Sequence, residues 1–136
     1  MREPFEAGYL LINLGPQHAF DLTQFLIEHF LKEETLNRAS SMSLESFKPF
    51  VEKLLERTLH VPFSYAVLEK KSLKMVACAM SSLWKNESSA AEHTAGDEFT
   101  FGAEKDLAIE AVGKILTELH AKFFELKPDL EHVLHL

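Results

Sequence analysis

The chain has 136 residues, the ordinary length of one domain, with 46% hydrophobic and 26% charged residues, which is typical of a folded protein rather than a disordered one. The formal net charge is −7, and the densest basic stretch holds only Lys70, Lys71 and Lys74. Because phosphate backbones require an extended positive face, we expect no nucleic-acid partner.

Hydropathy and cysteine content indicate in which cellular compartment the protein is expected. No apolar run approaches the ~20 residues of a membrane span, and the first residues lack the apolar core of a signal peptide. We therefore expect a cytoplasmic protein without a membrane partner. Cys78 is the only cysteine, which excludes an internal disulfide, and we interpret it as a small buried hydrophobe.

The first third of the chain predicts a strand and a helix. Tyr9–Asn13 is a short apolar run closed by Gly15 and Pro16, as in a buried strand. Residues 19–32 carry apolar side chains at steps of three and four, which predicts a helix with His29 on its apolar stripe as a hydrogen-bonded core residue. Residues 33–42 show no period, so we expect a connector.

The middle of the chain predicts a helix followed by a hairpin. Ser43 is a candidate N-cap for a helix whose apolar positions include Phe47, Val51 and Leu55. The runs 63–69 and 74–84 flank a polar turn and predict two antiparallel strands. Ser81 and Ser82 lack the setting of a nucleophile, and we expect them to be solvated.

The last third predicts a loop, a helix and a strand. Residues 85–100 are rich in Ser, Ala and Glu, which indicates a flexible loop. Apolar residues from Ile109 to Phe123 line one face of a long helix that ends near Pro128, and residues 130–136 form a final strand. The prediction is one α/β (α+β) domain over residues 1–136, with a mixed, mainly antiparallel sheet flanked by helices.

Two segments carry a resemblance to a known family. Residues 29–37 (HFLKEETLN) resemble the end of the first helix in arylalkylamine N-acetyltransferases, which reads as an aromatic pair, two charged residues and Glu-Pro-Leu-Asn, with Thr35 here in place of the proline. Residues 75–80 (MVACAM) are similar to the family's small-residue strand, and Val133 opens a strand similar to the next one. The element order also resembles the N-terminal half of the GNAT acetyltransferase fold.

The resemblance implies roles for two residues. Glu34 matches the family's glutamate that accepts the amine proton, a step that is needed because an ammonium group has no lone pair. Asn37 would belong to the substrate-binding pocket. The alternative interpretation is that Glu33 and Glu34 are solvated charges after a helix and that Asn37 belongs to a connector.

Cofactor and metal sites are not predicted. In the family, the last of these strands leads into a glycine-spaced loop whose backbone amides hold the acetyl-CoA pyrophosphate. None of the five glycines has that spacing, so acetyl-CoA is expected only for a full-length family member and no cofactor-binding residue is assigned. None of the seven histidines forms a metal-binding pair on a helix, which argues against a metal site.

These observations predict the front part of an acetyl-CoA-dependent N-acetyltransferase for an arylalkylamine or similar small amine, inactive as this chain alone. The alternative is a non-catalytic interaction module that reuses the front of the fold. Under both hypotheses we expect a homodimer through the C-terminal strand edge, because an open edge leaves backbone groups unpaired.

Overall fold

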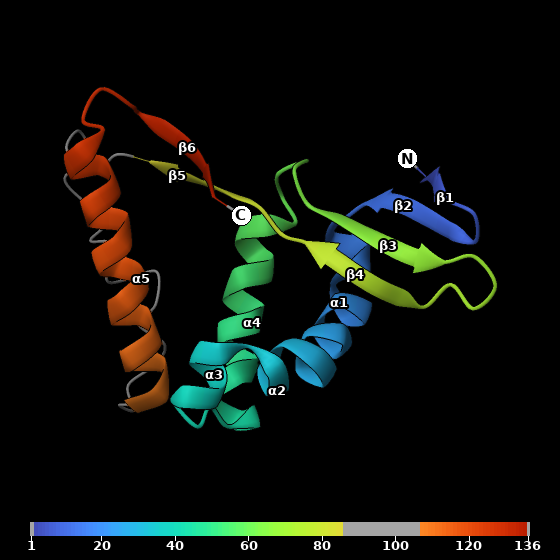
Figure 1. The fold of residues 1–136 in the computed structure, drawn as a ribbon, viewed down its shortest axis with the longest axis horizontal. Helices are drawn as coiled ribbons and strands as arrows, with labels where there is room; N and C mark the ends of the chain where they lie inside the picture. Colours follow the sequence, from blue (N-terminus) through green and yellow to red (C-terminus); the bar gives the residue numbers. More distant parts are fainter. Residues whose placement is uncertain (1, 86–106, 136) are drawn as a thin grey trace.

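A computed structural model describes residues 2–85 and 107–135 (Figure 1). The predicted loop over residues 85–100 lies outside the described residues apart from Lys85, which ends a strand. The strands are β1 (Arg2–Glu6), β2 (Tyr9–Asn13), β3 (Tyr65–Glu69), β4 (Met75–Ala79), β5 (Ser82–Lys85) and β6 (His132–His135). The helices are η1 (Pro16–His18), α1 (Ala19–Phe25), η2 (Leu26–Phe30), α2 (Leu31–Glu33), α3 (Thr35–Ala39), α4 (Leu44–Thr58) and α5 (Leu107–Leu126).

Four strands form an antiparallel sheet in the order β1-β2-β3-β4. β2 and β3 pair in register from Tyr9 opposite Glu69 to Asn13 opposite Tyr65. Gly8 supplies the positive φ of 93° in the β1–β2 turn, a conformation that glycine adopts without steric cost. The pairing of β3 and β4 confirms the predicted hairpin, but the strand predicted over residues 74–84 ends as β4 at Ala79, and its last residues belong to β5. β1 was not predicted.

The main core lies between one face of this sheet and helices α1 and α4. Alternate residues of β2 and β3 point to it, as the two-residue period of a strand requires. The helices supply the apolar stripes that their sequence spacing predicted, and Phe47 and Val51 of α4 are fully buried. The buried residues of this cluster are Ile12, Leu14, Leu22, Leu26, Phe47, Val51, Leu55, Leu59, Ala66 and Leu68.

The strand that begins as β4 breaks at Met80 and Ser81 and continues as β5, which leaves the four-stranded sheet (Figure 1). The hydroxyl of Ser64 holds this break, because it accepts a hydrogen bond of 3.0 Å from the Ser81 backbone nitrogen and donates one of 3.2 Å to the Thr58 carbonyl. Ser81 and Ser82 are therefore buried, and the expectation that they are solvated was wrong.

β5 pairs with β6 in a separate two-stranded antiparallel sheet, with Ser82 opposite His135 and Lys85 opposite His132. Trp84 joins this sheet to α5: its ring centroid lies 4.1 Å from that of His120 and 3.9 Å from that of His135. The sequence-based fold class is confirmed, with a mainly antiparallel arrangement of strands and flanking helices (Figure 1).

Candidate functional site

The two residues singled out from the sequence lie at the junction of α2 and α3. Glu34 ends the α1–η2–α2 run with an extended ψ of 135° and is the N-cap of α3. Residues 35–39 are thus helical, and the expectation of a connector over residues 33–42 was wrong in this part. The short helix was missed because it depends on its cap and not on an apolar period.

Glu34 and Asn37 contact each other directly. The Asn37 backbone nitrogen donates a hydrogen bond of 2.8 Å to Oε2 of Glu34, which satisfies one of the free amides at the start of α3. The Asn37 side chain is buried, and its Nδ2 donates to the Phe30 carbonyl at 3.2 Å. Both residues therefore shape the turn. Glu34 is half-buried, and Oε1 has no hydrogen bond to a described residue.

The run that leads to Glu34 contains a π-helical turn, η2, which extends from Leu26 to Phe30. A π turn shifts every later side chain around the helix axis, and such turns are frequent at functional sites. His29 is exposed and its ring stacks obliquely on Phe25 with centroids 4.8 Å apart. The prediction of a core histidine at this position was therefore wrong.

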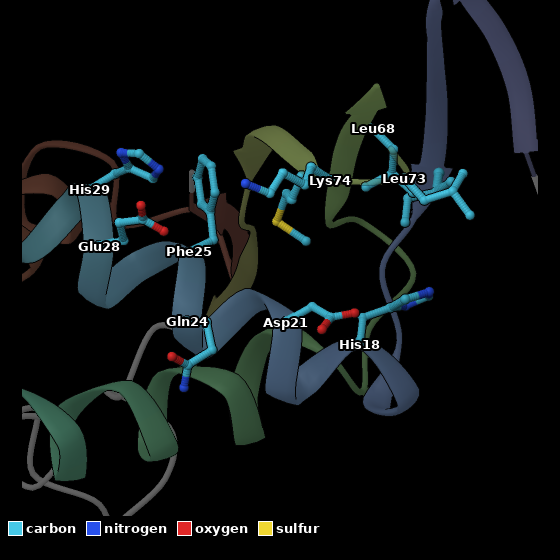
Figure 2. Close-up of a pocket in the computed structure, with 11 residues that line it drawn as sticks. His18, Asp21, Gln24, Phe25, Glu28, His29, Leu68, Leu73 and Lys74 are labelled. Carbon is cyan, nitrogen blue, oxygen red and sulfur yellow. The ribbon is translucent and has the colours of Figure 1, made fainter. Parts of the chain in front are cut away.

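A surface groove of about 600 Å³ lies between this helical run and the β3–β4 hairpin (Figure 2). Asp21, Phe25 and Glu28 form its helical wall, while Lys74 extends from the hairpin toward Phe25 (Figure 2). The other lining residues are Ile12, His18, Gln24, His29, Leu68, Leu73 and Met75. Neither Glu34 nor Asn37 belongs to this lining. Sequence reasoning missed the groove, because its two walls are about fifty residues apart in the chain.

The described residues offer neither a metal-binding cluster nor a membrane-spanning helix. Over residues 2–85 and 107–135 there is no group of three or more His, Cys, Asp or Glu side chains placed to hold a metal ion. None of the described helices is long and apolar enough to span a membrane. Cys78 is partly buried against the core, and this burial raises the pKa of its thiol, as expected for a packing residue rather than a nucleophile.

Comparisons with known proteins define the fold class. Neither a protein-family description nor a curated protein matches the chain. A solved structure, an insect arylalkylamine N-acetyltransferase 7 from the yellow fever mosquito Aedes aegypti, matches with a TM-score of 0.65 at 16% sequence identity. The match covers 93% of this chain but 50% of the mosquito chain. The chain therefore has a GNAT-like fold, and it spans about half the length of that mosquito protein.

Proposed function

We propose that this cytoplasmic chain is the front part of an N-acetyltransferase that acts on an arylalkylamine or similar small amine and that it has no turnover alone. The observation that carries the proposal is the fold likeness to half of the mosquito protein. The similarity of residues 29–37 to the family's helix end supports it independently, since it locates Glu34 at the end of the same helical run.

Glu34 is suited to accept a proton from the amine. An ammonium group must lose a proton before its nitrogen can attack a carbonyl carbon. Oε2 of Glu34 caps α3, while Oε1 has no hydrogen bond to a described residue and would bind a water molecule or the amine. The capping bond also holds the carboxylate in place. Asn37 donates that bond, so its role toward the substrate is to position Glu34.

The described residues do not fit acetyl-CoA. A pyrophosphate group requires consecutive backbone donors at a helix N-terminus, with glycine allowing close approach. Of the glycines that the structure describes, Gly8 and Gly15 lie in or beside short turns and Gly113 lies inside α5, so none of them stands at the start of α4 or α5. We therefore derive no step of acetyl transfer from this chain beyond proton acceptance by Glu34.

The proposal is tested on the longer gene product that it implies, of which this chain would be the front part. The assay measures release of the CoA thiol from acetyl-CoA with and without an arylalkylamine. Glu34→Asn keeps a side-chain oxygen at the N-cap but removes the base, and should lower kcat/KM about a hundredfold or more. Glu33→Gln, which changes the neighbouring exposed carboxylate, is the matched control. Unchanged turnover in Glu34→Asn would remove Glu34 from the mechanism.

A second candidate function is a homodimeric interaction module. β6 pairs with β5 along one edge, and no other described strand pairs with β6 along its second edge. Leu134, which is 48% exposed, would then become covered by a second copy. Light scattering should give a dimer for the native chain and a monomer for Leu134→Lys. A monomeric native chain at high concentration would eliminate this candidate.

A further inference from the structure

The groove between α1 and the β3–β4 hairpin carries charges that are not paired with one another. Asp21 and Glu28 project from its helical wall and Lys74 from the opposite wall (Figure 2). Within the residues that the structure describes, none of these three side chains forms an ion pair. Their charges are therefore available to a ligand instead of being neutralised inside the protein.

The two carboxylates are separated along the helical run. Asp21 lies on α1 and Glu28, seven residues later, lies on the π-helical turn η2. Phe25 lines the same groove, and its ring stands between the two charged side chains (Figure 2). The wall thus offers an acidic group, an aromatic surface and a second acidic group in a row.

The opposite side of the groove is apolar apart from Lys74. Ile12, Leu68 and Met75 form the sheet side of the lining, and Met75 packs against the main core. Figure 2 shows the Lys74 side chain extending toward Phe25, so one ammonium group of the protein already approaches this wall. A bound cation would therefore be repelled by Lys74 and attracted by the two carboxylates.

We propose that this groove binds a linear aliphatic diamine, with one ammonium group beside Asp21 and the other beside Glu28. Its methylene chain would cross Phe25 and contact the apolar side of the groove. A monoamine can pair with only one of the two carboxylates and should bind more weakly. An anionic ligand would be repelled by both carboxylates. The inference does not depend on acetyl transfer, because it concerns binding to this chain alone.

The test is an NMR titration of the 15N-labelled 136-residue chain with diamines from propanediamine to octanediamine, and with butylamine as the monoamine. Solvent-exposed ion pairs are weak, so we expect a dissociation constant on the order of 1 mM that is smallest for the longer diamines. Shifts should be largest for amides of residues 18–29 and 73–75. Added salt should weaken binding.

Charge variants should change the affinity for diamines in opposite directions. Asp21→Asn and Glu28→Gln should each weaken binding of the longer diamines about two- to fivefold. Lys74→Met should strengthen it by a similar factor, because it removes a competing ammonium group. Glu52→Gln, an exposed carboxylate on α4, should have no effect. Equal binding of butylamine and the diamines, equal effects of Glu52→Gln and Glu28→Gln, or no shifts at all would overturn the proposal.

Discussion

The Asn37 backbone nitrogen donates a hydrogen bond of 2.8 Å to the carboxylate of Glu34, so the two residues that resemble a catalytic motif form one structural unit. The bond makes Glu34 the N-cap of α3. A change at Glu34 therefore has two separable effects, one on the stability of the turn and one on any proton transfer.

The first prediction concerns this cap. Glu34→Ala should lower the free energy of unfolding by about 1 kcal/mol, because the Asn37 amide loses its acceptor, whereas Glu34→Asn should leave it nearly unchanged. Urea denaturation followed by circular dichroism measures both. If Glu34→Ala is as stable as the native chain, the hydrogen bond to Asn37 contributes nothing to the turn.

The second prediction concerns Ser64, which holds the break between β4 and β5. Ser64→Ala should lower the free energy of unfolding by about 1–3 kcal/mol, because it leaves the buried Ser81 amide without an acceptor. Hydrogen exchange at the Ser81 amide should become faster. Ser72→Ala is the control: it removes hydrogen bonds to Glu69 and from the Lys74 amide that are exposed to water, and it should change the stability by less than about 0.5 kcal/mol.

The third prediction is a stabilising substitution at Leu73. This residue has a φ of 55° in the β3–β4 turn and is 54% exposed, so it adopts a left-handed conformation without gaining much burial. Asparagine tolerates that conformation, and Leu73→Asn should raise the free energy of unfolding by about 0.5–1 kcal/mol. Leu83→Asn, at a similarly exposed strand position, should bring no gain. A loss of stability in Leu73→Asn would contradict the turn geometry.

The fourth prediction concerns the pH dependence of Cys78. Burial raises the pKa of its thiol above the ordinary value of 9.0, so the unfolded chain releases this proton at lower pH than the folded chain. The contribution of the thiol to stability is therefore constant below pH 9 and decreases as the pH rises toward the folded pKa. The native chain should lose more stability than Cys78→Ala between pH 9 and 10. Parallel pH profiles would contradict a buried thiol.

Much of the fold could be predicted because it rests on local periods. The apolar spacing in α4 and α5 and the alternation in β2 and β3 each point one face to a core. Ser43 was also identified correctly as the N-cap of α4, where its hydroxyl accepts a hydrogen bond from the Ser46 amide.

The rest depends on interactions that a local pattern does not contain. His29 lies in the π turn η2, which rotates it away from the apolar stripe. No residue type in that segment predicts a π turn. Ser81 is buried because Ser64, seventeen residues earlier, binds its backbone. The groove combines a helix with a distant hairpin. The Glu34–Asn37 contact could have been predicted from the sequence, because the side chain of an N-cap residue typically accepts a hydrogen bond from the amide three residues later.

We propose that this chain, which has a GNAT-like fold, does not bind acetyl-CoA by itself. Calorimetric titration of acetyl-CoA into the 136-residue chain tests it most directly, with the natural gene product titrated in parallel. We predict no heat of binding for the chain and clear binding for a product that continues into a glycine-spaced loop. Saturable binding of acetyl-CoA to the 136-residue chain itself would show that the chain holds a cofactor site of its own and would overturn the proposal.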